Sequence, residues 1–321
     1  MVGEFNRSQA YAKVRMDIDG VFEGGGIRGI ALAGAAAAAM DAGYAFRRAA
    51  GTSAGAMVAS LVAAGYDGDK LREAVCKADW PALLDPMPWT RIPGIGKHIS
   101  LMLHHGMYRG RMLEERWGRL LAAKGVRTFG DLSPGSLKLV ATDITHQSGV
   151  VLPEDLREYG IDPMGFSVAR AVHMSAAVPF VYVPVRLPHR DADGEVVLMS
   201  DGAMASRFPL EVLQPSEGRP IVGFRLSDDD ATHEHVPIRG PIALAIAIIG
   251  SGMGARETLP RLALEPGRVV TVPAERDVLD FDITPQEARQ LFDAGRVAAA
   301  EWFATNNPET PSVPLSDRPE S

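Results

Sequence analysis

A serine lies at the centre of the segment GTSAG, residues 51–55, which has the spacing G-x-S-x-G. A nucleophilic serine needs this spacing because it sits at a strained strand-to-helix turn, where small neighbours relieve the crowding. The unpaired N–H groups and the dipole at the start of the following helix would also stabilise nearby negative charge. Ser53 is therefore a candidate nucleophile, while a plain helix N-cap at Thr52 or Ser53 would give the same pattern.

A glycine-rich loop, EGGGIRG at residues 23–29, precedes this serine and matches the dinucleotide-binding pattern G-x-G-x-x-G. A dinucleotide site also needs an acidic residue roughly 20 residues onward, at the end of the second strand, to bind the ribose hydroxyls. The chain has FRRAAGTSAG there, without an acid, and Asp41 belongs to a predicted helix. The sequence therefore disfavours a dinucleotide and leaves two interpretations, a tight turn and a loop that binds another anion.

The two motifs together point to acyl transfer. Two successive strand-to-helix turns of adjacent parallel strands would place the glycine loop beside Ser53. The N–H groups of Gly25 and Gly26 would then point toward an attacked carbonyl, and glycines from Gly24 to Gly26 would let a tetrahedral intermediate approach the backbone. Arg28 either adds positive charge at this place or serves as a structural ion-pair partner.

A serine hydroxyl needs a base. The order of a Ser-Asp-His triad would use His233 or His235, which lie in the charged segment DDDATHEHVP. The other candidate is Asp201 in VVLMSDGAMAS, which ends a predicted strand next to small residues, although Asp-Gly pairs are also common turn formers. A metal site is disfavoured because no histidine pair has the H-E-x-x-H spacing; the histidines considered are His104, His105, His233 and His235.

Three ordered motifs, GGGIRG, GTSAG and DGA, resemble the patatin-like phospholipase family, as does ARAVHMSAAVPFVYVPV at residues 169–185. The resemblance extends to about the final helix, but not over the insertion at residues 80–111 or the C-terminal tail. The chain departs from the family pattern at Glu23, where plant members often have Asp, and at Ala203, where Gly is more frequent. Neither departure alters the nucleophile or the base.

The resemblance implies a lipid acyl hydrolase with a Ser-Asp dyad and neither a metal nor another cofactor. By matching positions, Ser53 is the nucleophile and Asp201 the general base of an acyl-enzyme mechanism. The loop that stabilises the oxyanion is implied to comprise Gly24, Gly25, Gly26 and Arg28. Because an ordinary Asp with a pKa of ~3.9 is a poor base at neutral pH, we expect burial to raise the pKa of Asp201.

The implied substrate is a phospholipid or another acyl ester, cleaved in the manner of a phospholipase A or a lysophospholipase. The alternatives are a soluble esterase or thioesterase with the same dyad, and a non-catalytic lipid-binding module. The insertion contains apolar side chains that would line an acyl-chain pocket, dip into a lipid surface, or simply pack in the core. These are Met87, Trp89, Ile92, Ile95, Ile99, Leu101, Met102, Leu103 and Met107.

Composition limits the remaining possibilities. The formal net charge of -7 predicts no general attraction to nucleic acid, and the single cysteine, Cys76, excludes an internal disulfide. The N-terminal residues lack the apolar segment of a secretory signal, and the apolar stretch PIALAIAIIG at residues 241–250 is short of the ~20 residues that span a bilayer. We therefore expect a cytoplasmic protein, for which peripheral contact with a membrane is allowed.

The elements that must position these residues alternate between strand-like and helix-like segments, which predicts an α/β fold with parallel strands and helical crossovers. The resemblance adds a three-layer α/β/α arrangement around a central, mostly parallel sheet. We expect one hydrolase domain over residues 1–305, with the insertion at about 80–111, and a flexible tail at 306–321. Thr284 and Pro285 predict the N-cap and first position of a final helix. The predicted strands, expected to share one sheet, are VRMDIDGVFE, YAFRRAAG, LKLVATDI, FVYVPVRL, EVVLMSD, PIVGFRL and GRVVTVP.

Overall fold

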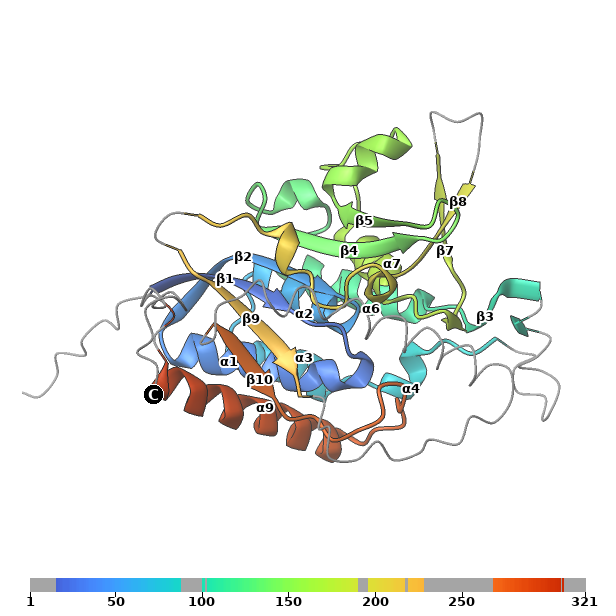
Figure 1. The fold of residues 1–321 in the computed structure, drawn as a ribbon. Coiled ribbons are helices and arrows are strands. Elements are labelled where there is room, and N and C mark those ends of the chain that lie inside the picture. Colours follow the sequence, from blue (N-terminus) through green and yellow to red (C-terminus); the bar gives the residue numbers. More distant parts are fainter. Residues whose placement is uncertain are drawn as a thin grey trace, which may run out of the picture.

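The computed structural model describes residues 16–87, 100–101, 103–189, 196–216, 219–227, 268–306 and 308. Its main sheet has the strand order β10-β9-β1-β2-β4-β8-β7, with β5 paired to β4 (Figure 1). The pairs among β10, β9, β1, β2 and β4 are parallel, whereas β5, β7 and β8 join by antiparallel pairing. The strands are β1 (Met16–Phe22), β2 (Tyr44–Thr52), β4 (Leu137–Asp143), β5 (Ser148–Leu152), β7 (Val185–Pro188), β8 (Val196–Asp201), β9 (Ile221–Leu226) and β10 (Val269–Val272).

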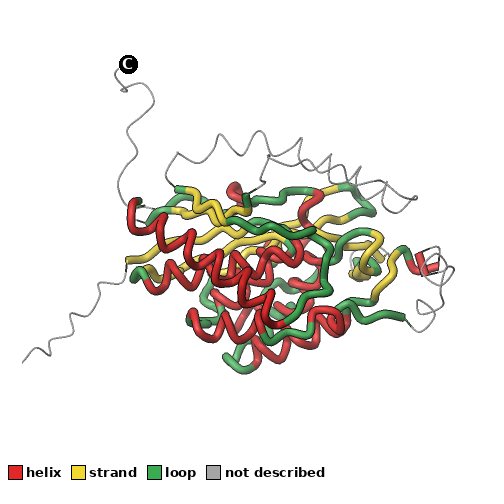
Figure 2. The backbone as a smooth tube through the Cα atoms, turned by 90° about the horizontal axis from the view of Figure 1, so that it is seen from below, coloured by secondary structure: helices red, strands yellow, loops and turns green. Residues whose placement is uncertain are grey.

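Helices flank this sheet, and Figure 2 shows how they gather on one side of the strands. The α-helices are α1 (Gly29–Asp41), α2 (Ala54–Ala63), α3 (Gly68–Cys76), α4 (Trp80–Leu83), α6 (Arg111–Ala122), α7 (Val168–Ala176) and α9 (Pro285–Thr305). Short 3-10 helices are η1 (Gly26–Arg28), η3 (Phe129–Asp131), η4 (Glu154–Tyr159), η5 (Gly202–Met204) and η6 (Leu210–Val212). A second, smaller hydrophobic cluster joins the segment around η6 to Val21, Ala50 and Val140 of the sheet.

The predicted α/β fold with a central, mostly parallel sheet is confirmed, but the expectation of a single sheet is wrong at one segment. FVYVPVRL divides into β6 (Phe180–Tyr182) and β7, and β6 pairs with β3 (Gly106–Tyr108) in a separate two-stranded sheet. The break has a local cause, because Pro184, between the two strands, has no N–H to donate to a ladder. The predicted tail lies outside the described residues, except for Asn306 and Pro308.

Strand register brings the three motifs to one place. Phe22, the last residue of β1, pairs with Gly51 of β2, so the glycine loop and Ser53 leave the sheet side by side. Thr52 pairs with Val140 of β4, and the next β4 residue, Ala141, pairs with Asp201. The serine and the aspartate therefore reach the same level of the sheet from different strands.

Helix α1 is held against α9 by direct backbone contact. Every α1 residue from Gly29 to Ala39 is buried, as expected for a helix that is apolar on all sides. A Cβ on Gly34 would collide with the carbonyl of Phe292, and one on Gly295 would collide with the carbonyl of Ala31. The capping box of Thr284 and Glu287 starts α9 at the predicted residue. The helix that follows the glycine loop thus rests on a close-packed support.

Gly295→Ala should destabilise the protein by about 1–3 kcal/mol, because the added methyl has no room beside the Ala31 carbonyl. Gly118→Ala, in the interior of α6, is the matched control. Its Cβ would lie 3.7 Å from the Cβ of Ala169, an ordinary contact, so the better helix propensity of Ala should stabilise by up to about 1 kcal/mol. Urea unfolding of both variants measures the difference; equal stability of the two would contradict the close α1–α9 packing.

Candidate active site

Ser53 occupies a strained turn between β2 and α2, with φ of +55° and ψ of -121°. The two glycines of the motif have separate reasons to lack side chains. A Cβ on Gly51 would collide with the backbone of Gly55, and one on Gly55 would collide with the carbonyls of Phe22 and Glu23. The turn can therefore form only because Gly51 and Gly55 have no side chains, since neighbouring backbone atoms fill that space. The turn that carries Ser53 lies directly against the glycine loop.

The structure brings Ser53 and Asp201 into direct contact. The Oγ of Ser53 donates a hydrogen bond of 2.6 Å to Oδ2 of Asp201. The second carboxylate oxygen, Oδ1, accepts the N–H of Ala203 at 2.8 Å. Both residues are buried, with 5% of Ser53 and 3% of Asp201 exposed. The pair has the arrangement of a nucleophile and its general base.

Burial raises the pKa of Asp201 to about 6, and the hydrogen bonds from Ser53 and Ala203 oppose this rise. The direction agrees with the sequence-based expectation. The carboxylate remains ionised at neutral pH, yet it is a stronger base than an ordinary aspartate. Because this pKa is close to the ordinary pKa of histidine, ~6.5, a rate change near pH 6 cannot by itself distinguish Asp201 from a histidine.

The amides at the centre of the glycine loop are free to bind a ligand. Gly24 donates its N–H to the carbonyl of Arg207 at 2.8 Å, and Ile27 donates to the carbonyl of Val278 at 3.1 Å. Between them, the N–H groups of Gly25 and Gly26 have no hydrogen-bond partner within the part of the chain that the structure describes. Gly25 is buried and Gly26 is half-buried. Because N–H groups away from water are rarely left unpaired in folded proteins, these two amides are candidates for binding an anion.

Gly24 differs from the next two glycines, because its N–H is bonded to Arg207 and does not donate to an oxyanion. Gly24 instead allows close packing, since a Cβ on it would lie 3.3 Å from the Cβ of Ser53. Arg28 lies beside the loop, with its Nε 3.9 Å from the place that a Cβ on Gly25 would take. Its charge is therefore near the free amides, and both roles considered for Arg28 remain compatible with this position.

Sequence reasoning missed Ser175, which supports the strained turn. Its Oγ accepts the N–H of Ser53 at 3.0 Å and donates to the carbonyl of Val140 at 2.5 Å. Ser175 is fully buried near the end of α7. The only signal for it in the sequence is its place in the stretch ARAVHMSAAVPF, and nothing in that stretch indicates a contact with residue 53.

Arg207 and Glu23 form a second support that sequence reasoning missed. The Nε of Arg207 donates to the carbonyl of Gly24 at 3.1 Å and lies 3.3 Å from Oε1 of Glu23. The other oxygen of Glu23 accepts the N–H of Leu226 at 2.6 Å. The residue before the glycine loop is thus a buried carboxylate balanced by an arginine that also fixes the first glycine.

His233, His235 and the apolar stretch 241–250 lie outside the described residues, as do Trp89, Ile92, Ile95, Ile99 and Met102 of the insertion. Of the remaining insertion residues, Met87 is buried, whereas 67% of Leu103 is exposed. Within the described ranges, no group of three or more His, Cys, Asp or Glu side chains is arranged to hold a metal, and no helix is long and apolar enough to cross a membrane.

Comparison with known proteins agrees with the family that the sequence motifs indicate. The model of the patatin-like phospholipase family matches residues 20–213. The chain is 36% identical over 284 residues to the uncharacterized protein YqhO of Bacillus subtilis (strain 168), which covers 88% of this chain and 96% of that relative. It is 21% identical over 286 residues to an uncharacterized protein of Acanthamoeba polyphaga mimivirus, over 85% of this chain and 89% of the relative. The solved structure of VipD from Legionella pneumophila has the same fold, with a TM-score of 0.54 and 17% identity over 92% of this chain and 67% of VipD.

The raised pKa of Asp201 predicts a pH-dependent gain in stability for Asp201→Asn. A carboxyl whose pKa is about 6 when folded and 3.8 when unfolded favours folding below pH 4, and this contribution is lost as pH rises to 6. Relative to wild type, the free energy of unfolding of Asp201→Asn should therefore increase by up to about 3 kcal/mol between pH 4 and pH 7.

Urea unfolding at several pH values measures this difference. Ser53→Ala serves as a second variant, because it removes a hydrogen bond that lowers the pKa of Asp201 and should move the loss of stability to higher pH. Wild type and Asp201→Asn with parallel pH profiles would contradict the raised pKa.

Proposed function

The chain belongs to the patatin-like phospholipase family, a family of lipid hydrolases, and from this premise we propose that it is a phospholipase A or lysophospholipase that acts through a Ser53 acyl-enzyme. The observation that carries the proposal is the buried 2.6 Å hydrogen bond from Ser53 to Asp201. The glycine loop that lies against Ser53 adds the amides of Gly25 and Gly26, which have no partner among the described residues. Acyl transfer requires a nucleophile, a base and such donors together, and simple lipid binding does not.

In the proposed reaction, the Oγ of Ser53 attacks the ester carbonyl while Asp201 takes the hydroxyl proton. The carbonyl oxygen of the tetrahedral intermediate becomes an oxyanion, which the amides of Gly25 and Gly26 stabilise. When the intermediate collapses, the bond to the alcohol breaks, and Asp201 returns the proton to the leaving oxygen. A water molecule then attacks the acyl-enzyme and gives a proton to Asp201. When this second intermediate collapses, the bond between the acyl carbon and Oγ breaks, Asp201 returns the proton to Oγ, and the fatty acid leaves.

Buried surroundings suit each of these steps. Asp201, with a pKa of about 6, is ionised at pH 7 and binds a proton strongly enough to act as the general base. Each well-placed amide donor in a site of this kind contributes ~10²–10³ to the rate of acyl transfer.

We further propose that the substrate is a phospholipid or another acyl ester met at a membrane periphery in the cytoplasm. The exposed Leu103 of the insertion supports contact with an apolar surface.

A fluorophosphonate probe should label the wild-type protein covalently at Ser53, and Ser53→Ala should neither be labelled nor hydrolyse esters. Mass spectrometry of the labelled peptide identifies the site. Hydrolysis of a panel of phospholipids, lysophospholipids and short-chain p-nitrophenyl esters separates a lipid hydrolase from a short-chain esterase or thioesterase. Folded wild type that resists the probe and hydrolyses no member of the panel would leave only the lipid-binding alternative.

The pH dependence of kcat/KM should show one acidic limb, with activity falling below about pH 6 as Asp201 becomes protonated. Variants assign the limb where pH cannot. Asp201→Asn should reduce kcat by about 10³-fold or more, because Asn cannot accept the proton. Replacing His233 and His235 together by Gln should change kcat less than about 3-fold and leave the limb in place. Loss of turnover in the histidine variant, with Asp201→Asn active, would instead indicate a histidine-dependent triad.

A further inference from the structure

The free amides of Gly25 and Gly26 lie between two loop residues, Gly24 and Ile27, whose N–H groups are hydrogen-bonded. The partner of Ile27 comes from the C-terminal part of the chain. Val278 accepts the N–H of Ile27 at 3.1 Å, and its carbonyl oxygen occupies the place of a Cβ on Gly26, where φ is +57°. Val278 lies in the connection between β10 and α9, beyond residues 20–213 that the family model matches. A segment outside the motifs therefore determines where the loop can lie.

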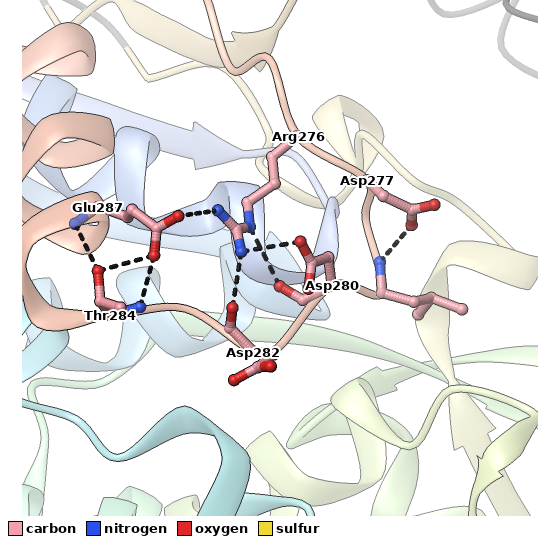
Figure 3. A network of polar contacts seen from close by, with 7 residues as sticks. Arg276, Asp277, Asp280, Asp282, Thr284 and Glu287 are labelled. Carbon is pink, nitrogen blue, oxygen red and sulfur yellow. Dashed lines mark hydrogen bonds and ion pairs between the residues drawn. The ribbon is translucent and has the colours of Figure 1, made fainter.

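One guanidinium, that of Arg276, organises this connection (Figure 3). Its Nε donates to the carbonyl of Asp280 at 3.3 Å, and its Nη2 donates to the carbonyl of Asp282 at 2.8 Å. The same side chain pairs with the carboxylate of Asp280 at 2.8 Å and with Glu287 at 3.2 Å. Only 16% of the Arg276 side chain is exposed. The turn that presents Val278 thus closes around a single, largely buried side chain.

The turn is also anchored to a rigid base through Glu287. Glu287 accepts the backbone N–H and the hydroxyl of Thr284 at the start of α9, and these bonds, with that of Arg276, lower its pKa to about 2 (Figure 3). Helix α9 in turn packs against α1, the helix that continues from the glycine loop. Arg276 therefore links α9, which packs against α1, to the glycine loop that precedes α1.

We propose that Arg276 is a positioning residue for the oxyanion site: it holds the Val278 carbonyl against Gly26 and Ile27 and so fixes the free amides of Gly25 and Gly26. This inference rests on the proposed acyl hydrolase function. A hydrogen-bond donor stabilises an oxyanion only when it is held at the correct distance, so a displaced loop lowers the rate of the chemical step without weakening the binding of the acyl chain.

Arg276→Ala should lower kcat for a p-nitrophenyl ester by about 10–100-fold, with KM within about 3-fold of wild type. The rate constant of fluorophosphonate labelling should fall in parallel, because the phosphonyl oxygen occupies the same position as the oxyanion. Arg296→Ala is the matched control. Arg296 belongs to α9, the helix that Arg276 contacts through Glu287, and pairs with Asp41 at 2.7 Å. Asp41 is at the far end of α1, about 18 Å from the loop. Its kcat should stay within about 2-fold of wild type.

Folded Arg276→Ala with wild-type kcat would overturn the proposal. An equal loss of kcat in Arg296→Ala would also overturn it, because the cause would then be loosening of α9 as a whole. If Arg276→Ala does not fold, Asp280→Asn replaces it. The carboxylate of Asp280 is 44% exposed and makes only one of the contacts, so a folded variant with a smaller loss of kcat supports the proposal and an unchanged kcat contradicts it.

Hydrogen exchange keeps this inference separate from the proposed function. The peptide that contains residues 24–29 should exchange faster in Arg276→Ala than in wild type, and it should be unchanged in Arg296→Ala. This readout needs no turnover. Faster exchange in a protein that neither hydrolyses esters nor reacts with the probe would keep the positioning role and refute the acyl hydrolase. Unchanged exchange would refute the positioning role whatever the activity.

Discussion

The site depends on the close approach of two strand-to-helix turns whose backbones touch where side chains would otherwise lie. The carbonyls of Phe22 and Glu23 occupy the space beside Gly55, so the turn that carries Ser53 can form only against the glycine loop. This contact places the glycine loop beside Ser53, and a Cβ on Gly24 would lie 3.3 Å from the Cβ of Ser53. Asp201 enters from a strand that pairs antiparallel with β4 and completes the set. A side chain at Gly55 would push the turn that carries Ser53 away from the carbonyls of Phe22 and Glu23 and so from the glycine loop.

Several features of the site are unfavourable in isolation and must be stabilised by their surroundings. Ser53 has a positive φ, Asp201 is a buried carboxylate, and two backbone N–H groups have no partner among the described residues. Strain and buried polarity of this kind persist at functional sites when the surrounding structure holds them in place. Ser175 holds the backbone of the turn, Arg207 holds Gly24, and the packed pair of α1 and α9 supports the helix behind them. The surrounding structure therefore holds Ser53, Asp201 and the two N–H groups in an arrangement that would be unfavourable without it.

The sequence predicts the parts of this arrangement that local spacing determines. GTSAG and the glycine loop indicate their turns, and the end of VVLMSD indicates a carboxylate next to small residues. The pairing of Ser53 with Asp201 is implied by the resemblance to the patatin-like family and not by local spacing. The supporting residues could not. Ser175, Arg207 and Val278 are 122, 154 and 225 positions from Ser53, and their contacts come from tertiary packing that no local pattern encodes. The same limit applies to Gly24, because only the structure reveals that its N–H is bonded to Arg207.

The proposed mechanism requires that the hydroxyl of Ser53, the carboxylate of Asp201 and the amides of Gly25 and Gly26 act on one reacting atom. A crystal structure of the protein after reaction with a fluorophosphonate tests it most directly. We expect phosphorus bonded to the Oγ of Ser53, with the phosphonyl oxygen ~2.7–3.1 Å from the nitrogens of Gly25 and Gly26. A phosphonyl oxygen that points away from both amides, or phosphorus on a different residue, would contradict it.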